Sequence, residues 1–226
     1  MGELTASVAH EIRQPITAAV TNAKTCLRWL GRDQPDVAEA REAAARIIKD
    51  VTRAADTIST ISLLFKKGTL QRELVDVNEL VREMIVLVRG EANRYTISVR
   101  TDLAEDLPEV MADRVQLQQV FMNLILNGIE AMKEMSGGRE LTIKSEAGDG
   151  QLLISVSDTG VGLSREQADQ IFKAFFTTKD NGTGMGLPIS RSIIESHGGR
   201  LWATAHSGPG ATFQFSLPAT AAAAHA

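Results

Sequence analysis

Apolar residues in the stretch 37–65 recur at alternating spacings of three and four, the pattern of a coiled-coil seam held for about four heptads. A continuous seam of this length predicts one long helix over residues 35–66. The residues of the predicted seam are Val37, Ala40, Ala44, Ile47, Val51, Ala54, Ile58, Ile61 and Phe65.

A second amphipathic pattern precedes this helix, over residues 3–31. Its apolar residues fall within an arc of about 80° on a helical wheel. They are Val8, Ile12, Pro15, Ala19, Ala23, Cys26 and Leu30. The polar stretch GRDQPD at 31–36 predicts a short turn, so the two helices should form an antiparallel hairpin. Because one hairpin cannot enclose a core by itself, we expect two copies to form a four-helix bundle.

The pattern changes after the stretch KKGTLQRE at 66–73, beyond which helical segments alternate with strands of period two. We expect helices at 77–94 and 113–135, and strands at 96–103, 140–147, 151–158, 200–207 and 211–218. The predicted fold class is therefore α + α/β, a dimeric helical hairpin followed by a mixed sheet with helices packed on it. The expected domains are 1–68 and 69–218, with an alanine-rich, disordered tail at 219–226.

The charge balance, the cysteine count and the length of the apolar runs limit which partners and which cellular compartment we expect. The chain has 24 basic and 28 acidic residues, so its net charge of −4 predicts neither nucleic-acid binding nor direct membrane contact. The single cysteine, Cys26, excludes an internal disulfide and fits a reducing compartment. With no long apolar run and no signal-peptide pattern, we expect a cytoplasmic region. Any sensor or membrane segment upstream of His10 would lie outside this chain.

The first predicted helix carries a histidine on its polar side. His10 lies about 200° around the helix from Val8 and from Ile12, so it should face water. The adjacent Glu11 can accept a hydrogen bond from one imidazole nitrogen and leave the other as a nucleophile. Pro15 follows five positions later, and a proline inside a helix destabilises that helix by about 3 kcal/mol. An exposed histidine without a role remains the alternative at this point.

Polar side chains form a stripe along the predicted helix 113–135. Such a stripe is ordinarily a solvated face, but asparagine oxygens can also hold magnesium while water and phosphate complete its coordination. The strand 151–158 then ends in Asp158 on the core-facing side, where a carboxylate needs a donor such as an adenine amino group. The stripe comprises Gln116, Gln119, Asn123, Asn127 and Glu130, and the opposite side carries Leu117, Phe121, Leu124 and Ala131.

Glycine-rich segments follow that strand. The first is TGVG at 159–162, and the segment GPGATF at 208–213 begins the last strand. Between them, Gly182, Gly184 and Gly186 precede a helix with Pro188 near its start. A helix N-terminus of this kind presents free amides to phosphates. Taken singly, each glycine run indicates only a turn.

In this order and spacing the segments resemble the sensor histidine kinases of bacterial two-component systems. The stretch SVAHEIRQP resembles their H box, and NLILNGIEAM resembles their N box. DTGVGL, IFKAFF, GTGMGL and GPGATF resemble the G1, F, G2 and G3 segments of the catalytic domain. The resemblance covers about residues 4–218. It implies a HisKA-type dimerisation and phosphotransfer domain followed by an ATP-binding α/β sandwich of the Bergerat (GHKL) type.

The resemblance also implies the reaction. His10 would be the phosphoacceptor in ATP-dependent autophosphorylation, and Glu11 would take its proton. The phosphoryl group would then pass to an aspartate in the receiver domain of a response regulator. The expected cofactors are ATP and Mg²⁺, and the expected partners are a second copy of the chain and that regulator.

Further roles in the nucleotide site are implied residue by residue. Asn127 would ligate magnesium with support from Asn123, and Asp158 would bind adenine. Gly160 and Gly162 belong to the same segment as Asp158. A lid at about 173–185 would cover the phosphates. The remaining residues assigned by the resemblance are Thr212 beside the adenine, and Lys179, Gly182, Gly184, Gly186 and Leu187 around the phosphates.

One position separates this sequence from related hydrolases. Gyrase-like and MutL-like ATPases carry a glutamate one helical turn before the metal-binding asparagine, where it activates water. Asn123 occupies that place here, and an amide cannot act as a base. This favours transfer to an imidazole over a water-directed ATPase clamp. A nucleotide-gated dimeric interaction module of the GHKL superfamily, without phosphotransfer, remains the alternative function.

The residue four positions after the histidine departs from the common pattern. Many of these kinases have threonine or asparagine there, positioned to help dephosphorylate the partner, whereas this chain has Gln14. Its longer side chain predicts weak or absent phosphatase activity. We expect His197, in SHGGR, to cap a helix end rather than to act in catalysis.

Overall fold

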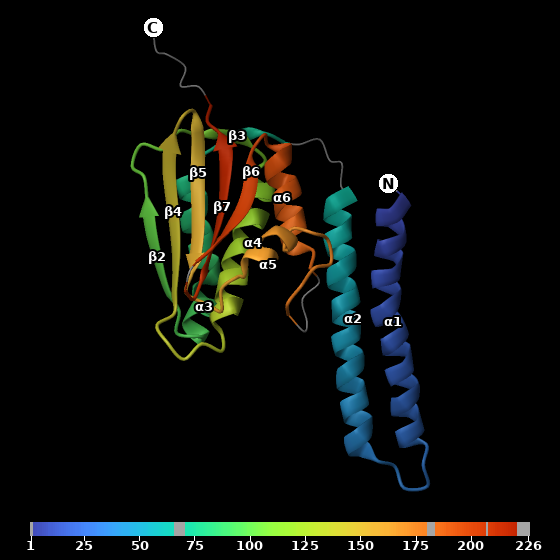
Figure 1. The fold of residues 1–226 in the computed structure, drawn as a ribbon. Helices are drawn as coiled ribbons and strands as arrows, with labels where there is room; N and C mark the ends of the chain where they lie inside the picture. Colours follow the sequence, from blue (N-terminus) through green and yellow to red (C-terminus); the bar gives the residue numbers. More distant parts are fainter. Residues whose placement is uncertain (1, 66–70, 180–183, 207, 221–226) are drawn as a thin grey trace. The chain divides into compact units, whose positions relative to one another are not determined.

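The computed structural model describes residues 2–65, 71–179, 184–206 and 208–220, without the side chains at 2–13, 52–53, 55–65, 165 and 169. The chain divides into two compact units. One comprises residues 1–67 with 177–185, and the other comprises 68–176 with 186–226. Figure 1 shows the elements of each unit.

The first unit is the expected helical hairpin. Helix α1 spans Gly2–Leu30 and continues through Pro15, and helix α2 spans Val37–Phe65. The turn between them is closed by a hydrogen bond from the amide of Asp36 to the carbonyl of Trp29, whose ring is covered by the Arg32 guanidinium at 3.7 Å. Midway along the hairpin, Asn22 donates to Asp50 at 2.9 Å. Polar contacts therefore set the pairing of the two helices in addition to the apolar seam.

The apolar positions of the hairpin divide into a buried and an exposed stripe, which corrects the predicted single seam. Ala43, absent from that seam, is fully buried, whereas the seam residues Val37 and Val51 are 59% and 52% exposed. The cause is that two stripes lie side by side on α2 and merge in the sequence pattern. The buried stripe includes Pro15, Ala19, Ala40, Ala43 and Ala54, and the exposed one Ile16, Val20, Leu27, Leu30, Val37, Ile48 and Val51.

The second unit is built on a mixed five-stranded sheet of order β2-β4-β5-β7-β6. Strands β2 and β4 are parallel and the other neighbours are antiparallel. Helices α3, α4 and α6 cover one face of this sheet (Figure 1). The helices are α3 (Val77–Arg94), α4 (Arg114–Met132), α5 (Arg165–Gln170) and α6 (Gly186–Ser196), and the sheet strands are β2 (Ser98–Leu103), β4 (Glu140–Gly148), β5 (Gln151–Asp158), β6 (Arg200–Ala205) and β7 (Ala211–Pro218).

The core of this unit lies between the sheet and the helices. Burial alternates along β5 and β7, as expected of strands with one covered face. Phe121 of α4 and Phe215 of β7 are both fully buried and meet edge to face, with ring centroids 5.4 Å apart. On the other face of the sheet, the indole of Trp202 donates to the Gln214 side chain at 3.0 Å. The sheet therefore has an apolar inner face and a polar outer face.

Short elements complete the unit and were not predicted from the sequence. Strands β1 (Glu73–Val75) and β3 (Val110–Ala112) form a separate antiparallel ribbon. Helix α5 begins with a capping box in which Ser164 and Gln167 bond to each other's amides. Just before β1, the Arg72 guanidinium donates to the carbonyl of Ser196 at the end of α6, at 2.7 Å.

The predicted disordered tail does not match the structure at its first two residues. Ala219 donates through its amide to Gly150, and Thr220 donates to Glu109. These bonds continue the path of β7 and hold the chain against neighbouring turns. The rest of the predicted tail lies outside the described residues.

Candidate active site

Helix α4 is the platform of the candidate nucleotide site. Asp113 caps it by accepting a hydrogen bond from the amide of Gln116 at 3.1 Å. The predicted apolar side is confirmed by Leu117 and Leu124, which have no exposed surface. The amide side chains of the opposite stripe are half-buried. The helix thus presents amide groups along one side while its other side anchors it in the core.

Two asparagines of this stripe are tied to each other and to α6. The side-chain nitrogen of Asn123 donates to the Ser190 hydroxyl at 2.9 Å. The nitrogen of Asn127 lies 3.4 Å from the oxygen of Asn123. Gly186, the first residue of α6, packs so closely that an added Cβ would lie 2.2 Å from that same oxygen. Asn123 therefore occupies the junction between α4 and the start of α6.

Asp158 lies at the end of β5 with its side chain toward the core, as predicted. It is 5% exposed, and one carboxylate oxygen accepts a hydrogen bond from the amide of Gly160 at 2.8 Å. All buried side-chain nitrogens and oxygens among the described residues have a partner. The buried carboxylate is thus held in one orientation by the loop that follows it.

Glycines bring three chain segments together around Asp158. The amide of Gly210 donates to the carbonyl of Gly160 at 2.8 Å, and a Cβ on Gly210 would lie 2.2 Å from the carbonyl oxygen of Asp158. A Cβ on Gly160 would lie 2.6 Å from the carbonyl of Ala131 in α4. Gly162 and Gly210 have φ values of 77° and 97°, which side chains disfavour. The three segments therefore pack so closely that a side chain at Gly160 or Gly210 would collide with a neighbouring backbone.

The structure separates Thr212 from this group and corrects its predicted place. In the pairing of β5 with β7, Asp158 lies opposite Ala211, and Thr212 lies opposite Ser157. The Thr212 hydroxyl is 2.7 Å from the Ser157 hydroxyl and 2.9 Å from the His206 ring, on the outer face of the sheet. Because successive strand residues point to opposite faces, Ala211 is the residue beside Asp158.

The predicted phosphate-binding residues fall into different units. Leu187 is half-buried in the first turn of α6, in the α/β unit. Lys179 and Gly184 belong to 177–185, which groups with the hairpin. The amide of Lys179 donates to the Thr177 hydroxyl at 3.1 Å, and Gly184 has a left-handed φ of 64°. Gly182 lies outside the described residues.

The predicted phosphoacceptor region lies within α1. The helix runs without interruption through His10, Glu11 and Gln14. The side chains of His10 and Glu11 lie outside the described residues, while that of Gln14 is exposed. Helical spacing puts Gln14 on the same face as His10, one turn later.

Sequence reasoning did not assign a site role to Ser190, Gly128 or Gly210. Gly128 sits inside α4, where a Cβ would lie 2.6 Å from the Leu141 side chain and 3.4 Å from Asp158. A glycine inside a helix costs about 0.5–1 kcal/mol relative to alanine, so its presence in NGIEAM was a detectable signal. Ser190 carried no such signal, because its role depends on how α6 packs against α4.

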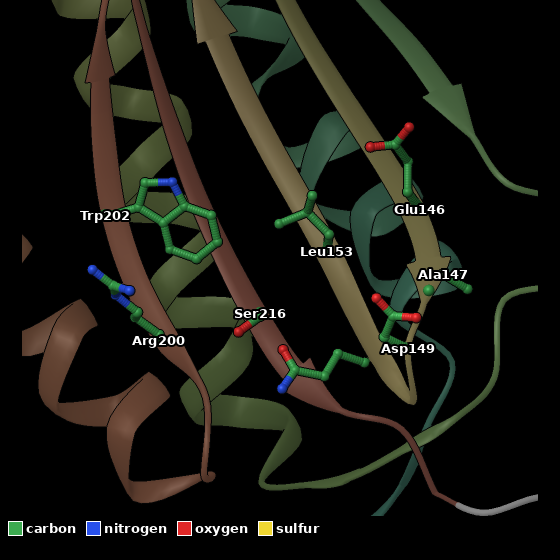
Figure 2. Close-up of a pocket in the computed structure, with 9 residues that line it drawn as sticks. Glu146, Ala147, Asp149, Leu153, Arg200, Trp202 and Ser216 are labelled. Carbon is green, nitrogen blue, oxygen red and sulfur yellow. The ribbon is translucent and has the colours of Figure 1, made fainter.

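A depression of about 760 Å³ lies on the outer face of the sheet (Figure 2). It contains none of the predicted site residues. Acidic and basic side chains are mixed along and beside it, and the Glu146 carboxylate raises the pKa of the neighbouring Lys144 through a 2.9 Å hydrogen bond. Its lining comprises Glu146, Ala147, Gly148, Asp149, Gln151, Leu153, Arg200, Trp202 and Ser216.

Two further properties of the described residues bear on the site. Among their His, Cys, Asp and Glu side chains, no group of three or more is placed to hold a metal ion. None of the helices in the described ranges has the length and apolar character needed to cross a membrane.

Comparison with protein families matches both units. Residues 1–93 match the His Kinase A (phospho-acceptor) domain, and residues 112–221 match the histidine kinase-, DNA gyrase B- and HSP90-like ATPase family. The chain belongs to the sensor histidine kinases. This histidine kinase chain is 39% identical to the sensor histidine kinase TmoS of Ectopseudomonas mendocina over 96% of its own length and 23% of that protein.

Solved structures support the same family. The catalytic domain of histidine kinase ThkA is 36% identical, with a TM-score of 0.61 over 67% of this kinase chain and 97% of that domain. ThkA in complex with the response regulator TrrA is 31% identical, with a TM-score of 0.74 over 97% of this chain and 62% of that one. Full-length ShkA with AMPPNP is 26% identical, with a TM-score of 0.69 over 98% of this chain and 47% of that one.

The comparisons also set the scale of this chain. It spans between 23% and 46% of the length of the curated sensor kinases it matches. The fold expected from the sequence, a helical hairpin followed along the chain by an α/β sandwich of GHKL type, is confirmed.

Proposed function

We propose that this chain is an ATP-dependent protein-histidine kinase that phosphorylates its own His10 and passes the phosphoryl group to an aspartate of a response regulator. The observation that carries the proposal is the position of Asn123. It lies one turn before Asn127, bonded to Ser190, where water-directed relatives have a glutamate. An amide cannot take a proton from water, so the acceptor is supplied by the imidazole of His10.

The residues around Asp158 fit an adenine nucleotide. The buried carboxylate can accept a hydrogen bond from the adenine amino group, and the glycines beside it let the neighbouring backbone segments pack closely. The match to an ATPase family and the likeness to AMPPNP-bound ShkA support this assignment. Gly160 and Gly162 would shape the base pocket. In the phosphate region we assign Gly186 and the amide of Leu187, with Lys179, Gly182 and Gly184 in the lid.

The donor set also fits magnesium. The nitrogen of Asn127 is directed to Asn123, which makes the Asn127 oxygen the atom suited to a hard cation. With no acidic cluster among the described residues, the ion would depend on this oxygen, water and nucleotide phosphates. Magnesium would neutralise phosphate charge during transfer.

The transfer itself joins a ring nitrogen of His10 to the γ-phosphorus and breaks the bond to the bridging β,γ oxygen, so that ADP leaves. Glu11 takes the proton that the imidazole gives up. Positioning and charge neutralisation dominate such reactions, so the protein's contribution is to bring the two groups into line.

Dimerisation is the second part of the proposal. The exposed stripe on the hairpin carries apolar side chains on both helices, including Leu27 and Ile48 at 70% and 69% exposure. A second hairpin covering this stripe would form the four-helix bundle that the sequence predicts. The match to the phospho-acceptor domain family supports this arrangement.

The regulator is the proposed recipient because a similar kinase, ThkA, has been solved in complex with a response regulator. We propose that its receiver domain docks on the hairpin near His10. Gln14, one turn further along, leads us to propose weak or absent phosphatase activity. Rapid loss of phosphate from a purified phospho-regulator on addition of this protein would contradict that.

The first test is incubation with magnesium and γ-labelled ATP, followed by acid and alkali treatment of the labelled protein. We expect a label that survives alkali, is lost in acid and is absent from His10→Gln. Asp158→Asn should lose nucleotide binding and label together, whereas Asp149→Asn, in the turn between β4 and β5 at the opposite end of β5 from Asp158, should keep both. ATP binding without label would favour a nucleotide-gated module instead.

Transfer is tested with a panel of purified receiver domains, each beside a variant whose acceptor aspartate is replaced by asparagine. Loss of label from the kinase and its appearance on one intact receiver domain is the expected result. If labelled kinase passes phosphate to none of them under conditions that sustain autophosphorylation, the proposed relay is wrong.

A further inference from the structure

Helices α4 and α6 run antiparallel and are joined at two points. The first is the bond from Asn123, midway along α4, to Ser190 in the first half of α6. The second lies at the other end of α6, where the amide of Asp113 donates to Nε2 of His197 at 2.9 Å. The second bond therefore holds the end of α6 against the start of α4.

Both ring nitrogens of His197 are used by the backbone. Nδ1 lies 2.8 Å from the carbonyl of Ile193, so Nδ1 carries the proton, and Nε2 accepts from Asp113. The side chain is 5% exposed. This bonding excludes the ring as a nucleophile and goes beyond the helix cap expected from the sequence, because the ring reaches a second helix.

Asp113 has two roles at this junction. Its amide binds His197, and its carboxylate caps α4 through the amide of Gln116. A displacement of His197 would therefore disturb the first turn of α4. The same helix carries Asn123 at its midpoint and Asn127 one turn further on.

The start of α6 has no free space to absorb such a displacement. A Cβ on Gly186 would lie 2.2 Å from the Asn123 oxygen, so this glycine is packed directly against the Asn123 side chain. Sliding of α6 along α4 would break the bond to Ser190 or press Gly186 into Asn123. The position of the N-terminal end of α6, at Gly186 and Leu187, thus depends on the bond that holds its C-terminal end at His197.

We propose that His197 is a positioning residue for the nucleotide site. By accepting the amide of Asp113 it sets the position of α6 along α4, and so keeps Gly186 and Leu187 in place beside Asn123. The inference rests on the proposed function for its link to ATP, but the structural part concerns the protein without nucleotide.

The test compares two substitutions at one position. His197→Gln keeps an acceptor near the place of Nε2, whereas His197→Leu keeps the bulk and leaves the Asp113 amide without its partner. The matched control is Asn78→Ala, because Asn78 is also buried and bonds Ala104 and Ser145, but on α3 and away from α6. All variants are compared at a temperature where each is fully folded.

The first measurement is hydrogen exchange of residues 189–194 in the nucleotide-free protein. His197→Leu should raise exchange there about tenfold, while His197→Gln and Asn78→Ala should stay within about threefold of the natural chain. Equal exchange in all four proteins, or an equal rise in His197→Leu and Asn78→Ala, would overturn the proposal.

The second measurement is the dissociation constant for magnesium-AMPPNP. His197→Leu should weaken binding about tenfold or more, with His197→Gln and Asn78→Ala near the natural value. Equal loss of affinity in His197→Gln and His197→Leu would contradict the proposal, because it would show that the hydrogen-bond acceptor is not the deciding feature. If the natural chain binds no nucleotide, the proposed function fails, and hydrogen exchange alone decides the role of His197.

Discussion

The hairpin and the α/β unit solve the problem of burying apolar surface in different ways. The α/β unit encloses large side chains such as Phe121 and Phe215 completely, between a sheet and a layer of helices. Among the described side chains of the hairpin, the buried ones are mainly alanines, and Leu27 and Ile48 are about 70% exposed. The contrast supports the proposal that the hairpin reaches a closed core only through self-association, whereas the α/β unit encloses its core within one chain.

The largest effect is expected from emptying the core of the α/β unit. Phe215→Ala removes a fully buried ring that contacts Phe121, which should cost about 3–5 kcal/mol of that unit's unfolding free energy. Calorimetry should show its transition moving to lower temperature while the hairpin transition stays in place. Equal movement of both transitions would contradict the separation of the two units.

The next effect concerns the exposed stripe of the hairpin. Ile48→Ser with Val51→Ser removes two residues that are more than half exposed, so the helices should still form. A dimer contains two copies of each position, so the variant replaces four apolar side chains. If each contributes about 1 kcal/mol to the free energy of association, the loss is about 4 kcal/mol, which raises the dissociation constant about a thousandfold. Sedimentation equilibrium measures this constant.

The control for that variant is Leu87→Ser, which changes a side chain 65% exposed on α3 of the other unit. It should leave self-association unchanged. A dimer weakened equally by both variants would place the self-association surface elsewhere.

A smaller effect is expected from a methyl group added at the candidate site. Gly160→Ala places a Cβ 2.6 Å from the backbone of Ala131, so it should destabilise the unit by about 1–3 kcal/mol and weaken AMPPNP binding. Gly90→Ala, in α3, meets nothing within 4 Å and should stabilise by about 0.5–1 kcal/mol. Urea unfolding measures the stability of both variants, and titration with AMPPNP measures their nucleotide affinity. Stabilisation by Gly160→Ala would show that the loop has room to move.

The smallest effect concerns α5 and acid. The Ser164 hydroxyl donates to the Glu166 carboxylate at 2.9 Å and lowers the pKa of that carboxyl. A lowered pKa contributes stability above the unfolded pKa of about 4.3, and that stability is lost as pH falls through the folded pKa. The protection of residues 165–170 against hydrogen exchange, relative to the intrinsic rate at each pH, should therefore fall in acid, and this change should be absent in Glu166→Gln. An identical acid response in that variant would assign it to other groups.

The elements with long patterns could be predicted from the sequence, but two details needed the structure. The two long hairpin helices follow from their apolar spacing, yet the choice of Ala43 over Ala44 for the buried stripe depends on the packing of α1 against α2. Strands β1 and β3 have three residues each, too few for a periodic pattern.

In the candidate site, Asp158 and the amide stripe of α4 were predictable because strand alternation and helical spacing place them. The outward direction of Thr212 could also have been predicted, because Phe213 and Phe215 mark the inward positions of β7 and Thr212 lies between inward positions. A shift of one residue in a strand moves a side chain to the other face. The bonds of Asn123 to Ser190 and of Asp113 to His197 could not be foreseen, because they join helices more than sixty residues apart in the sequence.

The two tryptophans give each unit its own optical label. Trp29 lies at the hairpin turn beneath the Arg32 guanidinium, and Trp202 lies on the outer sheet face with its indole bonded to Gln214. These are the two tryptophans of the sequence. Emission from Trp29→Phe therefore reports on the sheet alone and that from Trp202→Phe on the hairpin alone, so intrinsic fluorescence can follow the two parts independently without an attached dye.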